Sequence, residues 1–178
     1  MNNTRPDVPR SPVILLTGRP GIGKTTVIRR LAGLLTGRTI AGFYSEEIRA
    51  AGRRLGFGLS TFSGVTGVLA HVKMRSPHRV GRYGVDCGAF ERIALAELAR
   101  PADVLLIDEI GKMECFSARF VEALRKSLGQ SRPVVATVAL SGSGFIAEVK
   151  GRPDVELWQA TVQNRDALPA RLAERILR

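Results

Sequence analysis

The chain has 178 residues, of which 44% are hydrophobic and 24% are charged, and this composition excludes a disordered chain. Its length allows one sizeable hydrophobic core, and no linker-like stretch divides it, so a single α/β domain is expected. The net charge of +11 raises the question of a nucleic-acid partner, but the arginines are scattered and not interleaved with aromatic residues, so nucleic acid is possible and not favoured.

Residues 1–11 are polar and contain prolines, and we interpret them as an extension in front of a domain at 12–178. They lack the apolar stretch of a signal peptide. The longest apolar runs in the chain are also too short to span a bilayer. We therefore expect a cytoplasmic protein without a membrane partner.

An apolar run from Pro12 to Thr17 precedes the segment Gly-Arg-Pro-Gly-Ile-Gly-Lys-Thr-Thr, which fits the phosphate-binding pattern GxxxxGK(S/T). The run is short and branched, as in a buried parallel strand, and helical spacing follows the motif. The sequence therefore predicts a phosphate loop between a strand and a helix. The residues expected to bind nucleotide there are Gly18, Arg19, Pro20, Gly21, Ile22, Gly23, Lys24, Thr25 and Thr26.

Each part of this loop has a chemical role in the prediction. Gly18, Gly21 and Gly23 allow left-handed backbone conformations that turn N–H groups toward the β- and γ-phosphates. Lys24 supplies a charge to the β/γ oxygens as a catalytic residue, and Thr25 offers its hydroxyl to Mg²⁺. A glycine-rich turn without a ligand would explain the glycines, but not a Lys-Thr pair at this offset.

Two β-prone stretches at 40–48 and 55–62 surround the polar turn 49–54. A connection this short cannot make a parallel crossover, so the pattern predicts an antiparallel β-hairpin. A weaker strand is expected at 68–72. The segment 74–84, rich in Gly, Arg and Pro, is then predicted to be an exposed loop with a possible functional role.

Asp86 is predicted to cap a helix that ends near Ala99. After it, a buried strand at 103–108 ends in the acids Asp108 and Glu109, which is the Walker B pattern. This signal is weak alone and strong downstream of a complete phosphate loop. We expect Asp108 to hold Mg²⁺, and Glu109, facing the other side of the strand, to act on the attacking water. The simpler alternative for Glu109 is a surface carboxylate at a strand end.

The rest of the chain alternates helices and strands. The expected elements are a helix at 117–128, a strand at 133–138, a short helix at 145–150, a strand at 155–162 and a last helix capped by Asp166. This alternation predicts an α/β fold with a mainly parallel sheet flanked by helices. Ligands of such sheets bind at the carboxyl ends of the strands, where we expect the phosphate loop, Asp108 and Glu109.

Further candidates lie at the same predicted edge. Thr137 either senses the γ-phosphate or only caps a turn. Arg165 is predicted to bind nucleotide, and it shares with Arg19 and Arg82 the alternatives of transition-state charge, base contact or a solvated surface. Glu114 and Lys112 could pair with each other.

Four segments carry a resemblance to a known family: 42–49, 79–85, 164–166 and, most specifically, Asp-Glu-Ile-Gly-Lys-Met-Glu at 108–114. From about Val13 onward the chain resembles the small P-loop nucleoside-triphosphatases, which include the animal cancer-related enzyme and are also catalogued as predicted nucleotide kinases. The resemblance implies a Rossmann-like P-loop fold. It also implies Mg²⁺-dependent hydrolysis of ATP, GTP and other nucleoside triphosphates to diphosphate and phosphate, with broad base tolerance.

Two other functions remain open at this point. One is a nucleotide or small-molecule kinase, with an acceptor site formed by Glu46, Glu47 and the loop at 75–82. The other is a nucleotide-switched module that binds RNA or a protein through its positive charge.

Overall fold

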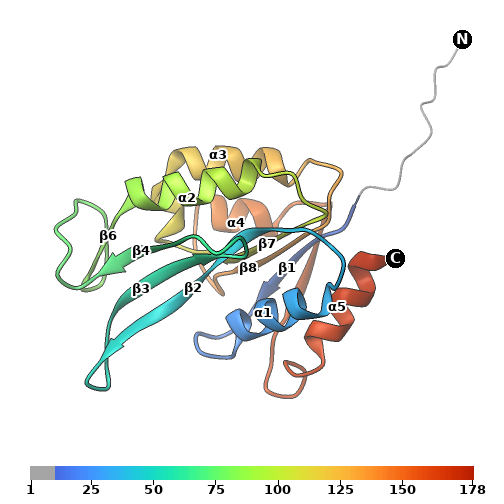
Figure 1. Ribbon diagram of the computed structural model, residues 1–178, viewed down its shortest axis with the longest axis horizontal. Coiled ribbons are helices and arrows are strands. Elements are labelled where there is room, and N and C mark those ends of the chain that lie inside the picture. The colour runs from blue at the N-terminus through green and yellow to red at the C-terminus, as the bar shows by residue number, and fades with distance from the viewer. Residues whose placement is uncertain (1–10) are drawn as a thin grey trace, which may run out of the picture.

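The computed structural model describes residues 11–178, so the predicted N-terminal extension lies outside the described residues except for Ser11. In this part of the chain a nine-stranded sheet, in the order β5-β6-β4-β3-β2-β7-β8-β1-β9, lies between two layers of helices (Figure 1). The strands are β1 (Val13–Thr17), β2 (Ile40–Ala50), β3 (Arg53–Thr61), β4 (Thr66–His71), β5 (Arg79–Val80), β6 (Tyr83–Val85), β7 (Val104–Ile110), β8 (Val134–Val138) and β9 (Val155–Gln159). The helices are α1 (Lys24–Leu34), α2 (Cys87–Ala99), the 3-10 helix η1 (Glu114–Phe116), α3 (Ala118–Ser127), α4 (Phe145–Lys150) and α5 (Leu168–Leu177).

The two halves of the sheet differ in strand direction. Strands β2, β7, β8, β1 and β9 are parallel neighbours, and β8 lies between β7 and β1. Strands β3, β4, β6 and β5 extend the sheet from β2 in antiparallel pairs. Their short connections allow only hairpins, because a parallel crossover needs a dozen or more residues. The predicted hairpin corresponds to β2 and β3, and the weaker strand predicted at 68–72 corresponds to β4, so β5 and β6 are the strands that the sequence did not predict.

The loop predicted at 74–84 is wrong in part, because it contains β5 and the start of β6. Tyr83 is buried there and packs its ring against Phe57 of β3, with ring centroids 5.3 Å apart. A strand of two or three residues has too little periodicity to be visible in the sequence. Its position depends on this contact with a residue that lies far away along the chain.

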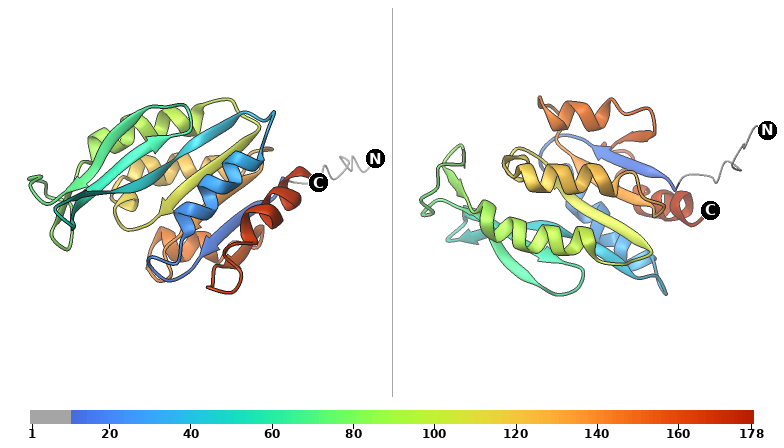
Figure 2. Two further views of the ribbon diagram at one scale, coloured as in Figure 1. Left: turned by 60° about the horizontal axis from the view of Figure 1, so that its bottom comes forward. Right: turned by 90° about the horizontal axis from the view of Figure 1, so that it is seen from above.

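The helices cover both faces of the sheet. Helices α2, α3 and α4 lie on one face, and α1 and α5 lie on the other (Figure 1, Figure 2). Each face of the sheet carries its own hydrophobic core, the first under α2, α3 and α4 and the second under α1 and α5. Successive side chains of β1 point to opposite faces, so Leu15 belongs to the first core and Ile14 to the second. In the first core, Phe43, Phe90 and Phe120 pack with ring centroids 4.9 to 6.0 Å apart. No helix within residues 11–178 combines the length and apolar character needed to cross a bilayer.

The end of the chain departs from the predicted boundaries. Strand β9 stops at Gln159 because the Asn164 side chain bridges the turn that follows, accepting from the Thr161 N–H at 2.8 Å and donating to the Gln159 carbonyl at 2.8 Å. Ala167, not Asp166, occupies the N-cap of α5. The Asp166 carboxylate accepts from Arg30 of α1 at 3.2 Å.

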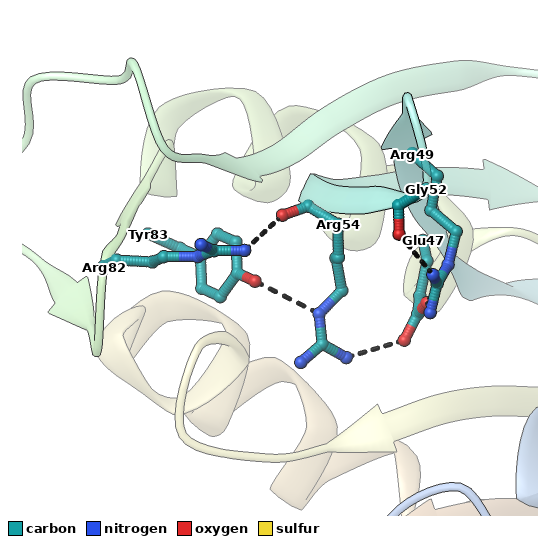
Figure 3. A network of polar contacts seen from close by, with 6 residues as sticks. All are labelled: Glu47, Arg49, Gly52, Arg54, Arg82 and Tyr83. Atoms are coloured by element: carbon teal, nitrogen blue, oxygen red, sulfur yellow. Dashed lines mark hydrogen bonds and ion pairs between the residues drawn. The ribbon is translucent and has the colours of Figure 1, made fainter.

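A polar network joins the hairpins of the antiparallel half (Figure 3). Arg54 of β3 donates to Glu47 of β2 at 2.6 Å and to the Tyr83 hydroxyl of β6 at 3.1 Å. Arg82 donates to the Arg54 carbonyl at 2.5 Å, and Arg49 pairs with Glu47 at 2.6 Å. The described contacts of the Arg82 guanidinium are therefore made in this network, and none is with the phosphate loop.

Candidate functional site

The predicted phosphate loop connects β1 to α1 at the carboxyl edge of the parallel half. Gly21 and Gly23 have φ values of 76° and 106°, a region that L side chains avoid, as predicted for both. Gly18 is nearly extended at φ 159°, and a Cβ there would lie 2.9 Å from the Ala160 carbonyl oxygen, so this position needs glycine for space. Helix α1 begins at Lys24 without an acid in its first turn, so its N–H groups and dipole favour an anion.

The Lys24 side chain is held inside the loop. It is 8% exposed, and its Nζ donates to the Gly18 carbonyl at 3.3 Å. The same ammonium lies 3.6 Å from Oε2 of Glu109. A cation is therefore fixed where the loop and the end of β7 meet.

Asp108 is fixed from two sides at the end of β7. It is 1% exposed, its Oδ2 accepts from the Thr25 hydroxyl at 2.6 Å, and its Oδ1 accepts from the Thr137 hydroxyl at 2.6 Å. Burial raises the pKa of the Asp108 carboxyl, whereas these two hydroxyls and the charge of Lys24 oppose the rise. The structure thus brings Thr25, Asp108 and Thr137 together, and the Thr137 hydroxyl is used to hold Asp108.

Glu109 follows Asp108 through a cis peptide bond and is half-buried. Its carboxylate faces Lys24, whereas that of Asp108 is held by the two threonines. The neighbouring acids therefore have different partners. Burial raises the pKa of Glu109, and the charge of Lys24 acts against that rise.

Glu114 is a third acid at this site, and the sequence did not reveal its environment. It is 6% exposed and accepts from the Gly111 N–H at 3.1 Å, while Lys112, its possible partner, is exposed and forms no described ion pair with it. A Cβ on Gly111 would lie 2.9 Å from Glu114 Oε2 and 3.5 Å from Glu109 Oε1. Both carboxylates thus flank Gly111. The only signal in the sequence was the third acid in the Asp-Glu-Ile-Gly-Lys-Met-Glu segment.

The buried Glu114 carboxyl should make stability depend on pH. Burial raises its pKa from 4.5 to about 8, and the charges of Glu109 and Asp108 add to this. Between these values the folded state binds more protons than the unfolded state, so the free energy of unfolding falls as pH rises through this window. Each unit by which folding raises the pKa corresponds to about 1.4 kcal/mol in the free energy of unfolding.

We therefore expect Glu114→Gln to remove the pH dependence of stability that Glu114 causes. A glutamine amide is neutral at every pH, and its carbonyl still accepts a hydrogen bond. The mutant should gain more in Tm over the parent protein at about pH 8 than at about pH 5. Thermal unfolding of both proteins without nucleotide at the two pH values measures the difference. Equal pH dependence in mutant and parent would contradict the assignment.

Two hollows flank the phosphate loop. The smaller, of about 230 Å³, is lined by Ile22, Gly23, Thr26 and Arg165 among others. Arg165, in the turn after β9, donates to the Ile22 carbonyl at 3.3 Å and so lies against the loop. The larger hollow, of about 490 Å³, contains Gly18, Pro20, Lys24, Glu109 and Glu114 in its lining.

The remaining candidates lie elsewhere or have other partners. Arg19 is exposed, and Arg82 belongs to the network between the hairpins. Glu46 accepts from Arg29 of α1 at 2.9 Å, and Glu47 pairs with Arg54 at 2.6 Å. The two acids that the kinase alternative assigned to an acceptor site therefore form ion pairs with arginines.

Comparison with known proteins gives one consistent picture. The sequence profile of a family described as NTPase matches residues 13–173. The nucleoside-triphosphatase THEP1 of Thermotoga sp. (strain RQ2) is 42% identical over 158 residues, covering 87% of this chain and 90% of the relative. The cancer-related nucleoside-triphosphatase of Homo sapiens is 39% identical over 174 residues, covering 87% of this chain and 91% of the human protein. The crystal structure of THEP1 from Aquifex aeolicus superposes with a TM-score of 0.85 at 32% identity, covering 93% of this chain and 99% of that one.

Proposed function

The chain belongs to the NTPase family, and on that premise we propose that it hydrolyses nucleoside triphosphates, including ATP and GTP, to diphosphate and phosphate in a Mg²⁺-dependent reaction. The observation that carries this proposal is the convergence of Lys24, Asp108 and Glu109 at the phosphate loop. The Lys24 ammonium is 3.6 Å from Glu109, and the Thr25 hydroxyl is 2.6 Å from Asp108. This arrangement contains the charge, the metal-binding oxygens and the carboxylate that phosphoryl transfer to water requires.

The residues present fit a magnesium ion. Mg²⁺ prefers oxygen ligands, and the Thr25 hydroxyl and Asp108 carboxylate would hold it. Burial raises the pKa of Asp108, so a cation beside it would stabilise the charged carboxylate. Within residues 11–178 no group of three or more His, Cys, Asp or Glu could hold a metal by itself, which suits an ion that binds together with the triphosphate. When bound, Mg²⁺ neutralises charge on the phosphate oxygens.

The protein's own groups have separate tasks in this proposal. The N–H groups of the loop and the Lys24 ammonium bind the β- and γ-phosphates, and they oppose the charge that builds on the leaving diphosphate. Glu109 faces the position of the γ-phosphate, where its carboxylate orients the attacking water and accepts its proton. Thr137 positions Asp108 through its hydrogen bond of 2.6 Å.

Product analysis tests the function directly. The purified protein would be incubated with ATP, GTP, CTP and UTP, with Mg²⁺ or with EDTA, and the nucleotides separated. We expect each triphosphate to yield its diphosphate and phosphate with Mg²⁺ only. Release of pyrophosphate, or equal rates with EDTA, would contradict the proposal. We further propose a cytoplasmic location. A gel shift with RNA that depends on salt and on nucleotide would instead support the alternative of a nucleotide-switched module that binds RNA or a protein.

Arg165 is proposed to contact the nucleoside. It lines the smaller hollow next to Gly23, and a guanidinium can stack on any base without reading its identity. Arg165→Ala should raise KM for ATP and GTP alike by about three- to tenfold, the range of a partly desolvated cation–π contact. Arg171→Ala is the matched control, since Arg171 lies over the Trp158 ring at 5.1 Å and does not line this hollow. Unaltered KM values in Arg165→Ala would rule out this placement.

A further inference from the structure

The larger hollow has an apolar wall that nucleotide hydrolysis does not use. Its apolar lining comes mainly from the antiparallel half of the sheet and from the segments after β7 and β8. These residues are Phe57, Leu69, Val80, Met113, Ala139 and Leu140. They face the same space as Lys24 and Glu109, so an apolar chamber adjoins the predicted position of the γ-phosphate.

The two hollows divide the space around the phosphate loop. They share no lining residue: Gly23 and Arg165 line the smaller one, and Gly18 and Lys24 line the larger one. A nucleoside beside Arg165 with its phosphates across the loop leaves most of the larger hollow free. At about 490 Å³ that hollow lies in the range of small-molecule sites, which are also mostly apolar with a few polar groups at one end.

We propose that the larger hollow binds a second substrate, a neutral alcohol with an apolar body, which accepts the γ-phosphoryl group. This inference rests on the proposed function, because hydrolysis is then the same transfer with water in place of the alcohol. The Glu109 carboxylate borders the hollow and repels an anionic acceptor, and the oxygens of Glu109 and Glu114 can each accept a hydrogen bond from a hydroxyl. Lys112 also lines the hollow, but it is exposed to solvent.

The transfer step balances without any further reactant. The acceptor's hydroxyl oxygen forms a bond to the γ-phosphorus, while the bond from that phosphorus to the β–γ bridging oxygen breaks. The electron pair of the broken bond stays on the nucleoside diphosphate. The hydroxyl proton passes to the Glu109 carboxylate, which later releases it to water. The products are an alkyl phosphate and the diphosphate.

The experiment uses the full chain with Mg²⁺ and γ-labelled ATP. Benzyl alcohol and isoamyl alcohol are the apolar probes, and glycerol at equal concentration is the polar control. Labelled alkyl phosphate and labelled inorganic phosphate are separated and counted from the same samples. We expect ester formation to saturate with either apolar alcohol and to exceed that with glycerol by about tenfold, the scale on which hydrophobic pockets discriminate.

Variants that fill the chamber test the location. Val80→Trp and Leu140→Trp should each lower ester formation by about tenfold while inorganic phosphate release without alcohol stays near the parent rate. Leu140 is 47% exposed, so its variant should fold even if Val80→Trp does not. Val65→Trp, at a site 51% exposed and outside the hollow, is the matched control.

Three results would overturn the acceptor site. They are phosphate release without any ester from either alcohol, equal ester with glycerol, and an equal loss in Val65→Trp. The first result includes the case in which an alcohol slows phosphate release without forming an ester, because the hollow would then bind an inhibitor. Absence of phosphate release from the parent protein would instead contradict the proposed hydrolysis, so the two failures are distinguishable.

Discussion

Glu109→Gln is expected to bind Mg²⁺-ATP as tightly as the parent protein and to hydrolyse it about two to four orders of magnitude more slowly, the usual contribution of a general base. Glutamine keeps the shape and most of the hydrogen bonding of glutamate, but it cannot accept the proton of the attacking water. Binding should persist because the phosphate loop and the Asp108 contacts, at 2.6 Å to Thr25 and to Thr137, are unchanged.

Titration calorimetry and single-turnover phosphate release on the same preparations separate these two effects. Glu46→Gln is the matched control, because Glu46 is a half-exposed glutamate that pairs with Arg29 at 2.9 Å. It should hydrolyse ATP at the parent rate. If Glu109→Gln also does so, the general base lies elsewhere. Glu114, which flanks the same Gly111, would then be the next residue to replace.

Lys24→Ala is expected to lose both nucleotide affinity and turnover, because the ammonium meets the β/γ oxygens in the ground state and in the transition state. A charge-assisted contact to phosphate is worth about 1.5 to 3 kcal/mol, so affinity should fall by roughly ten- to a hundredfold. Glu109 also loses its counter-charge at 3.6 Å, so its pKa should rise further.

The same two assays measure this mutant, with Lys126→Ala as the control. Lys126 lies on α3 with its side chain 73% exposed, and its removal should change neither quantity. Circular dichroism must first show that Lys24→Ala is folded. Parent-like binding and turnover in the folded mutant would contradict the assignment of 18–26 as the phosphate loop.

The sequence predicted those parts of the fold that depend on neighbouring residues. The left-handed Gly21 and Gly23 and the Asp86 cap of α2, which accepts from the Ala89 N–H at 2.8 Å, follow from patterns only a few residues long. From the rule that ligands bind at the carboxyl ends of parallel strands, Arg165 was also predicted to lie near the phosphate loop. In the structure it donates to the Ile22 carbonyl of that loop.

The errors depend on contacts between distant segments. Strands β5 and β6 are held by Tyr83 against Phe57 and Arg54, and a stretch rich in Gly, Arg and Pro carries no sign of those partners. Asp166 has the usual chemistry of a cap, but Ala167 occupies that position and the Asp166 carboxylate accepts from Arg30 of α1. The burial of Glu114 and the apolar chamber likewise exist only after several strands have assembled.

The most direct test of the proposed site is a crystal structure of Glu109→Gln with Mg²⁺-ATP. We expect the γ-phosphate against Lys24, the metal ion on the Thr25 and Asp108 oxygens, and the nucleoside beside Arg165. The amide side chain that replaces the Glu109 carboxylate should point toward the γ-phosphate. A triphosphate bound away from residues 18–26, or a metal ion that contacts neither Thr25 nor Asp108 directly or through water, would contradict this placement.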